Sequence, residues 1–257
     1  MMTDKRLSPR AVSAIIAIAI LAIWELSARS GMISPLLAPA PSAIVRTVVT
    51  EFTSREIFPH LALTLYRVMT GILVGGSVGV AAGLTMGMSR RLRQIADPFV
   101  AAIHPIPKIA ILPVLMALLG IGDLTRVTVV SLAVFFPMMI NTMNGVRQIN
   151  RTYLDVARNY GASGFRMFRR VVLPASLPMV LSGLRIAVNL ALLITISIEI
   201  AGANVGLGSL IWNSWEVMRI ETLYATLIVI MLFGIFLSGA VRLLTDILVP
   251  WSGDRRR

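Results

Sequence analysis

The sequence predicts an all-α membrane protein with six transmembrane helices, and composition and hydropathy both support this fold class. Apolar residues make up 56% of the chain and charged residues only 14%, and the mean hydropathy is +0.82. A run of about 20 apolar residues is long enough to cross a bilayer as a helix. Such runs occupy Ala11–Ala28, Leu63–Met88, Val100–Leu119, Leu124–Val146, Leu177–Ala201 and Leu223–Val249. They leave almost nothing for a soluble domain, so we expect one membrane domain over residues 1–257.

The positive charges predict how the chain is oriented. Basic residues precede the first run and follow the second, fourth and sixth runs: Lys5, Arg6, Arg10, Arg90, Arg91, Arg93, the six arginines from Arg147 to Arg170, and Arg255, Arg256 and Arg257. The opposite loops are poorer in Lys and Arg. Because cytoplasmic loops of membrane proteins are enriched in these residues, we expect both termini and the segment 155–174 on the cytoplasmic side. This placement also accounts for the net charge of +12 without a nucleic-acid partner.

The first run and the segment after it are the least regular part of the pattern. A run behind basic residues also resembles the apolar part of a signal peptide. We expect an uncleaved helix, since its removal would leave five spans and move the N-terminus across the membrane. The following segment Met32–Phe58 is rich in proline. We expect Ser42 to cap a short helix there, from Ala43 to about Phe52, lying along the membrane surface.

Glycines in the second run recur at every fourth residue. They are Gly71, Gly75, Gly79, Gly83 and Gly87. Glycine lets helix backbones approach closely in a membrane, so the stripe predicts tight packing against a neighbouring helix, with a sliding helix contact as the alternative.

The third run is interrupted by Pro105, Pro107 and Pro113, which remove backbone donors and bend or unwind a helix. Irregular backbone at membrane depth needs cover from protein or a water-filled cavity, so this stretch predicts a pathway through the membrane. His104 and Lys108 lie four residues apart, would share one helix face, and could attract an anionic solute. The alternative places both near the cytoplasmic interface, with the Lys108 ammonium reaching toward water.

Two further polar residues in the spans are candidates for the same pathway. Glu199 lies near the outer end of the fifth run, where it could form a gate, a polar helix contact, or an ion pair with a basic group such as Arg67. The ion pair is the interpretation that we favour. Asn189 lies nearer the cytoplasmic end and could hydrogen-bond across helices. The candidate pathway residues are therefore His104, Lys108, Asn189 and Glu199.

The segment Asp155–Pro174 lies between two apolar runs where a short turn would suffice. Apolar or small residues recur in it at helical spacing: Leu154, Ala157, Gly161, Phe165, Phe168 and Val172. The intervening positions include several arginines. We expect two short amphipathic helices, broken at Gly161 to Gly164, with the second ending at Leu173-Pro174. The segment has the character of a docking surface, and a solvated basic loop is the alternative.

The spacing of this segment resembles the EAA loop of ATP-binding-cassette (ABC) importer permeases. That loop reads Glu-Ala-Ala, three residues, Gly, nine residues, Ile, any residue, Leu-Pro. The matching positions here are Asp155, Val156, Ala157, Gly161, Val171, Leu173 and Pro174. Asp for Glu, Val for Ala and Val for Ile are the departures. The resemblance implies coupling helices that fit a groove on an ATPase, a form of helix-in-groove recognition, with Asp155, Ala157, Gly161, Phe165, Leu173 and Pro174 as site residues.

Longer stretches resemble the nitrate, sulfonate and taurine branch of these importer permeases. They read SRRLRQIADP, HPIPKIAILPVLMALLGIGD, FFPMMINTMNGVR, SGLRIAVNLA and IEIAGANVGLG. The resemblance implies a type I ABC importer-like permease fold, with its core at about residues 61–249 and a cytoplasmic coupling loop at 153–174. It also implies ABC ATPase subunits, a second permease copy and an extracytoplasmic solute-binding protein as partners, in a bacterial inner membrane. The solute would be small and anionic or zwitterionic, such as nitrate, a sulfonate, taurine or bicarbonate.

The residues themselves do not indicate an enzyme. The chain has no cysteine, its two histidines are far apart in sequence, and no GxxxxGK[ST] phosphate loop occurs. We therefore expect a non-catalytic subunit with no metal or cofactor of its own, and ATP bound by a partner.

Two other functions remain as alternatives. A self-contained secondary transporter would couple transport to an ion or proton through Glu199 or His104, but leaves the spacing of Gly161 and Leu173-Pro174 unexplained. A membrane-embedded enzyme or assembly factor would need a convergent set of acid, base or nucleophile, which the sequence does not offer.

Overall fold

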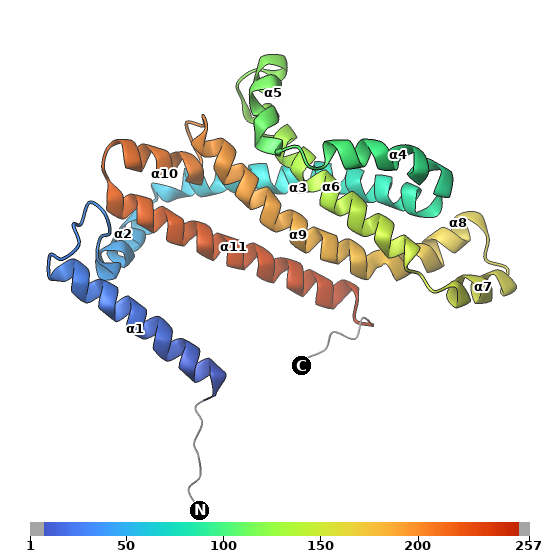
Figure 1. Ribbon diagram of the computed structural model, residues 1–257, viewed down its shortest axis with the longest axis horizontal. Coiled ribbons are helices and arrows are strands. Elements are labelled where there is room, and N and C mark those ends of the chain that lie inside the picture. The colour runs from blue at the N-terminus through green and yellow to red at the C-terminus, as the bar shows by residue number, and fades with distance from the viewer. Residues whose placement is uncertain (1–7, 252–257) are drawn as a thin grey trace, which may run out of the picture.

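The computed structural model describes residues 8–251, and this part of the chain is built from helices alone (Figure 1). In chain order they are α1 (Pro9–Arg29), α2 (Pro41–Thr53), α3 (Ile57–Met88), α4 (Arg90–Ile103), the 3-10 helix η1 (Lys108–Ile111), α5 (Leu112–Leu119), α6 (Asp123–Arg147), α7 (Arg151–Asn159), α8 (Gly164–Met167), the π-helical segment η2 (Phe168–Val172), α9 (Leu173–Ile200), α10 (Leu207–Glu216) and α11 (Ile220–Leu248). The long helices α3, α6, α9 and α11 form a bundle. Helices α7 and α8 lie at one end of it, and α2 and α10 lie at the other, which we call the far end.

Five described helices are long and apolar enough to cross a membrane. They are α1 from Ala11, α3, α6, the continuous helix 164–200 and α11. The third apolar run is not a straight span, because α4 and the helical stretch 108–119 meet at 84° and give a sixth span only if the bent pair is counted as one. Pro105 and Pro107 lie in the break, where the missing N–H groups and the restricted residues before each proline prevent a continuous helix.

The glycine stripe of α3 packs directly against α6, as predicted. A Cβ atom on Gly75 would fall on the carbonyl group of Ser131, 2.7 Å from its carbon, and one on Gly79 would lie 2.7 Å from the carbonyl oxygen of Phe135. These neighbours are backbone atoms, so no side-chain rotation could make room. The two helices therefore approach each other as closely as glycine permits.

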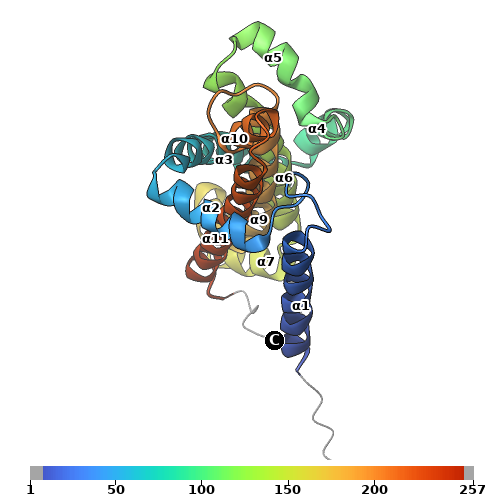
Figure 2. The same ribbon diagram turned by 90° about the vertical axis from the view of Figure 1, so that its left-hand side faces the viewer.

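Helix α1 stands apart from the bundle (Figures 1 and 2). It has no buried side chain in its apolar span and is joined to the rest near its C-terminal end. There the N–H and the hydroxyl of Ser42 donate to the Glu25 carboxylate at 3.0 and 2.7 Å. The expectation that Ser42 caps the following helix is wrong. Helix α2 starts at Pro41, two residues before the expected Ala43, because a proline in the first helical position needs no intrahelical partner for its nitrogen.

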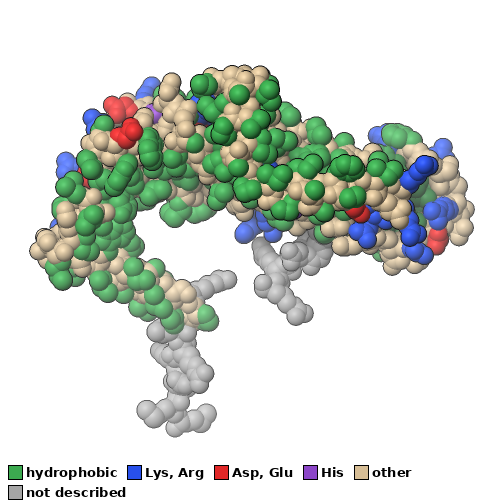
Figure 3. Space-filling view, turned by 45° about the horizontal axis from the view of Figure 1, so that its top comes forward, with side chains coloured by type: hydrophobic (Ala, Val, Ile, Leu, Met, Phe, Trp, Pro, Cys, Tyr) green, Lys and Arg blue, Asp and Glu red, His purple; other side chains and the backbone are tan. Residues whose placement is uncertain are grey.

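The surface is apolar along the bundle and charged at its ends. In Figure 3, hydrophobic side chains cover most of the length, and Lys and Arg side chains gather at the end that carries α7 and α8. This distribution suits a protein surrounded by lipid, with aqueous regions at both ends. The terminal basic residues Lys5, Arg6 and Arg255 to Arg257 lie outside the described residues.

Candidate functional site

The loop at one end of the bundle has a defined backbone. Helix α7 starts where the Asn150 side chain accepts the N–H of Thr152 at 2.9 Å. It ends in a Schellman motif, in which Ala162 N–H donates to the Ala157 carbonyl at 2.9 Å and Gly161 N–H to the Arg158 carbonyl at 2.8 Å. Gly161 has φ +75°, a left-handed conformation that glycine adopts without strain. The predicted break at Gly161 to Gly164 is confirmed.

This loop exposes large aromatic side chains. Tyr160 is 88% exposed, Phe165 is 73% exposed, and no residue of α7 or α8 is buried. Asp155 forms an exposed ion pair with Arg158, 3.0 Å apart, so its carboxylate can exchange partners at little cost. Exposed aromatic groups beside arginines are typical of protein interfaces. The loop thus has the composition of a docking surface that nothing in the described chain covers.

The second helix of the loop does not end at Leu173-Pro174, and that expectation is wrong. The chain stays helical from Gly164 to Ile200 over 37 residues. Pro174 lies in the first turn of α9, directly after the π-helical segment η2. A wider turn shifts the hydrogen-bond pattern by one residue and so accommodates the missing proline N–H. The loop of α7 and α8 is therefore continuous with a helix that runs to the far end of the bundle.

A buried ion-pair cluster occupies that far end. Arg67 of α3 donates from Nη1 to Glu199 Oε1 of α9 at 2.7 Å, and the two side chains are 2% and 0% exposed. Glu199 also accepts the Thr64 hydroxyl at 2.9 Å and the Gly208 N–H at 2.9 Å. The predicted ion pair between Glu199 and Arg67 is confirmed. It joins α3 to the end of α9 and the start of α10.

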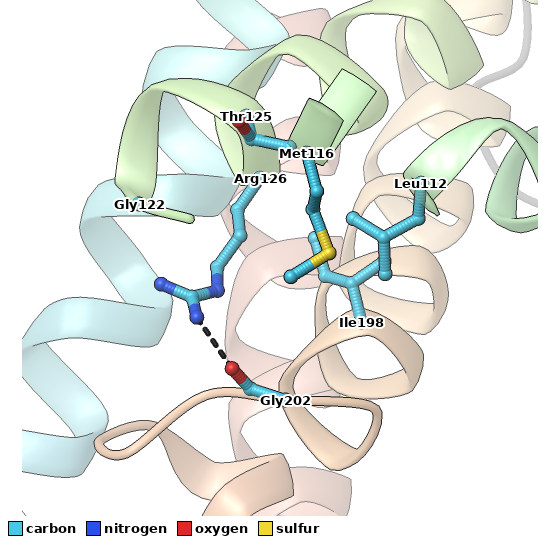
Figure 4. A pocket seen from close by; sticks show the side chains of 7 residues that line it. All are labelled: Leu112, Met116, Gly122, Thr125, Arg126, Ile198 and Gly202. Carbon is cyan, nitrogen blue, oxygen red and sulfur yellow. Dashed lines mark hydrogen bonds between the residues drawn. The ribbon is translucent and has the colours of Figure 1, made fainter. Parts of the chain in front are cut away.

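Two more charged residues complete this cluster, and sequence reasoning missed both roles. Arg67 donates from Nε and Nη2 to Asp123 Oδ1 at 2.8 and 2.7 Å. Arg126, 3.4 Å from the same Asp123 oxygen, donates to the Gly202 carbonyl at 2.6 Å (Figure 4). Asp123 follows Gly122 at the start of an apolar run, so its unusual position was visible in the sequence. Its partner was not, because Arg67 is 56 residues away.

Lys108 lies at the break of the third run and not, as expected, on a helix face shared with His104. Helix α4 ends at Ile103, so His104 and Lys108 do not share a helix face. The Lys108 ammonium donates to the carbonyls of Ile103, His104 and Ile106 at 3.0, 2.9 and 2.8 Å. It also lies 4.6 Å from the centre of the Phe136 ring. Its three donors are thus engaged, and Lys108 could reach a solute only by giving up at least one of these bonds. The pathway role of this pair stays a prediction.

Replacing Lys108 by alanine is expected to loosen the break between α4 and η1. The ammonium satisfies carbonyls at a helix C-terminus and neutralises the negative end of its dipole, so we expect Lys108→Ala to destabilise the fold by about 1 kcal/mol. Thermal unfolding of the purified protein measures this, with Lys108→Arg as the control that keeps the charge. An unchanged unfolding temperature together with weaker solute uptake would instead favour direct contact with the solute.

The remaining pathway candidates lie in separate contacts. Asn189 accepts the Ser238 hydroxyl at 3.3 Å and so links α9 to α11. Within residues 8–251, no hydrogen bond joins Asn189 or Glu199 to each other or to His104 and Lys108. The same residues contain no group of three or more His, Cys, Asp or Glu side chains that could hold a metal ion.

A cavity of about 490 Å³ opens between α3 and α6. Its lining is mainly apolar and includes Gly75, Thr128, Ser131 and Asp123. The hydroxyls of Thr128 and Ser131 donate to carbonyls of their own helix at 2.7 and 2.8 Å. These two hydroxyls therefore already have partners within α6.

Comparisons with known proteins all match membrane transport proteins. The family model described as "Binding-protein-dependent transport system inner membrane component" matches residues 71–257. The putative aliphatic sulfonates transport permease protein SsuC of Bacillus subtilis is 30% identical over 91% of this chain and 85% of its own length. The taurine transport system permease protein TauC of Escherichia coli is 29% identical over 91% of this chain and 87% of its own. An inward-facing structure of the MetNI methionine ABC transporter has a similar fold, with a TM-score of 0.60 at 18% identity, covering 76% of this chain and 95% of that one.

Proposed function

The chain belongs to the family of binding-protein-dependent transport system inner membrane components and is an ABC importer permease, and from this premise we propose its solute and its partners. The solute is a small anionic or zwitterionic compound, with sulfonates and taurine as the first candidates, because permeases named for these compounds resemble the chain over most of its length. Nitrate and bicarbonate belong to the same chemical class. The protein is a multi-pass inner membrane subunit without catalysis of its own.

ATPase subunits are the proposed partners of α7 and α8. The observation that carries this proposal is the exposed aromatic surface of the loop, at the end of the bundle where Lys and Arg gather. The chain contains no phosphate loop, so ATP would be bound by the partner, and no cofactor is needed on this subunit. In this proposal the loop and both termini lie in the cytoplasm, and the far end faces outward, where a solute-binding protein would deliver the solute.

A second copy of the chain is the proposed lateral partner. The cavity between α3 and α6 exposes small residues along two helices that already pack tightly. Small residues with internally bonded hydroxyls favour close contact with a further apolar helix in a membrane. Two copies related by a two-fold axis would bury both cavities against one interface.

Truncation of Phe165 tests the ATPase proposal. Phe165 is 73% exposed, and its ring centre lies 6.1 Å from that of Phe168. We expect Phe165→Ala to weaken the complex with the ATPase about 30-fold, because an aromatic anchor at an interface contributes about 2 kcal/mol. Co-purification and titration of the ATPase on the detergent-solubilised chain measure this.

The matched control is Trp215→Ala, which removes an aromatic side chain of comparable exposure from α10 at the opposite end. It should leave ATPase binding unchanged. If no ATPase binds the unaltered chain, the proposal fails. If Phe165→Ala binds as well as the unaltered chain, the assignment of the docking surface to α8 fails.

The rival function is a secondary transporter that couples to protons through Glu199. That residue is already bound by Arg67, Thr64 and the Gly208 N–H. These contacts account for both carboxylate oxygens, which favours a structural role for Glu199. Uptake driven by an ion gradient, with no ATPase present, would favour the rival.

A further inference from the structure

The contact between α6 and α9 differs in kind between its two halves. Toward α7 and α8 the helices meet through glycines: a Cβ on Gly145 would lie 2.8 Å from Met179 Cβ, and one on Gly183 would lie 2.8 Å from Asn141 Cβ. Such contacts have no room for one helix to shift against the other. This half of the pair should therefore behave as a fixed pivot.

Toward the far end, one polar bond links α6 to the residues just after α9, and further polar bonds reach the end of α9 and the same residues from α3. Arg126 of α6 reaches the Gly202 carbonyl just beyond α9, and Figure 4 shows this bond beside a cavity of about 10 Å³. The cavity is lined by Leu112, Met116, Gly122, Thr125, Arg126, Ile198 and Gly202. A cavity of this size has room for about one water molecule. The packing here is looser than at the glycine contacts.

The polar bridges all run to one unit, formed by the end of α9, the following loop and the start of α10. Arg67 donates to Glu199 and to the Val205 carbonyl at 2.7 and 2.8 Å. The Thr64 hydroxyl accepts the Leu207 N–H at 2.9 Å. On the other side of the contact, Arg67 stays tied to Asp123 of α6, and α3 and α6 are locked by their glycine stripe.

Ion pairs suit a contact that must open and close. The attraction within a buried pair roughly balances the hydration that both groups lose, so separating them into water costs little net free energy. The end of α9 and the start of α10 also bury Ile198 and Leu207 in the hydrophobic core, so opening this contact would in addition expose apolar surface. The Asp123 side chain is 41% exposed in the single chain, so this ion pair lies at the edge of the buried cluster.

We propose that Arg67, Asp123, Arg126 and Glu199 form an outer gate, which closes the α9–α10 unit onto α3 and α6 and opens during transport. Helix 164–200 joins the docking loop directly to Glu199 and is about 55 Å long at 1.5 Å per residue. A movement of the loop would therefore pivot the outer end of α9 about its glycine contacts. The inference rests on the proposed function, because the ATPase supplies that movement.

A reversible cross-link tests the gate in the complete transporter. The chain has no cysteine, so introduced thiols are the only ones in this subunit. We pair Arg126→Cys with Ala203→Cys, next to Gly202, and bridge them with bifunctional thiol reagents of graded length that form reducible disulfides. Solute uptake is measured in proteoliposomes that contain the chain, the ATPase and the binding protein. The cross-link should lower uptake at least about tenfold, and reduction should restore it.

The control pair joins two outer residues that the gate does not involve. The Thr47 hydroxyl donates to Glu221 at 3.2 Å, linking α2 to α11. A cross-linked Thr47→Cys, Glu221→Cys protein should keep its uptake. Undiminished uptake after cross-linking residues 126 and 203 overturns the gate. If the ATPase does not bind the unaltered chain, the proposed function is overturned, and the gate with it.

A second measurement covers the case in which the cysteine pair is inactive before cross-linking. Arg126→Leu removes the bond to Gly202, so ATP hydrolysed per solute transported should rise about tenfold, whereas Arg126→Lys keeps a donor and should stay near the unaltered value. A merely structural role would lower hydrolysis and uptake together and leave this ratio unchanged. An unchanged ratio in Arg126→Leu overturns the proposal.

Discussion

Gly75→Ala is expected to push α3 away from α6 and to destabilise the fold. The added methyl group would fall on the carbonyl group of Ser131, 2.7 Å from its carbon. Because the obstacle is helix backbone, relief requires the whole helix pair to move apart, which also loosens the contacts at the neighbouring glycines. We expect a loss of about 3 kcal/mol, at the upper end of the range for overpacking. Thermal unfolding in detergent should shift downward on the order of 10 °C.

The adjacent glycine provides the control. A Cβ on Gly76 would meet only Val134 and Met138 side-chain atoms, at 3.9 and 4.0 Å, which is ordinary contact. Gly76→Ala should therefore be neutral or slightly stabilising, because alanine loses less conformational entropy in a helix than glycine does. Equal unfolding temperatures for the two variants would contradict the assignment of the α3–α6 contact.

Gly161→Pro is expected to abolish transport while leaving the membrane bundle folded. Proline cannot adopt φ +75°, and it lacks the N–H that Gly161 donates to Arg158. The turn between α7 and α8 would have to rebuild, which would displace the exposed aromatic groups from one another. Since no residue of α7 is buried, the unfolding temperature should change little. ATPase co-purification and uptake in proteoliposomes are the measurements.

Gly161→Asn serves as the matched variant. Asparagine adopts the left-handed conformation more readily than other non-glycine residues and keeps the N–H, so it should retain most of the ATPase binding. If the proline variant binds and transports like the unaltered chain, the geometry of this turn plays no part in coupling. A loss in both variants would point to the space around the glycine rather than to its backbone conformation.

Local properties of the chain were sufficient to predict most of the fold. The lengths of the apolar runs located α1, α3, α6, α9 and α11, because burial in lipid requires about 20 apolar residues whatever the neighbours are. The four-residue spacing of the glycines predicted that α3 packs closely against a neighbouring helix, which is α6. The boundaries near prolines were predicted less well. Pro105 and Pro107 turn the third run by 84°, whereas Pro174 lies within a continuous helix, because the π-helical segment before it absorbs the missing donor.

In the candidate site, too, local features could be predicted from the sequence, whereas contacts between distant residues could not. The two helices of the segment 155–174 and the break between them could be predicted because their spacing lies within 20 consecutive residues, and the docking role stays a prediction. The pair of Arg67 and Glu199 could be proposed from the cost of two charges near apolar spans, but Asp123 and Arg126 could not be assigned to it. His104 and Lys108 were expected to share one helix face. They do not, because α4 ends at Ile103, and only the tertiary structure shows where this helix ends.

The sequence by itself determined the membrane class, the approximate positions of the long helices, the close-packing face of α3 and the position of the loop 155–174. Each of these follows from hydropathy, residue size or spacing along a short stretch of chain. Only the tertiary structure decided which charges share the far-end cluster, and that one helix connects this cluster to the docking loop. The contact of Arg67 with Glu199 spans 132 residues of sequence, and such contacts depend on how the helices pack, which no local pattern encodes.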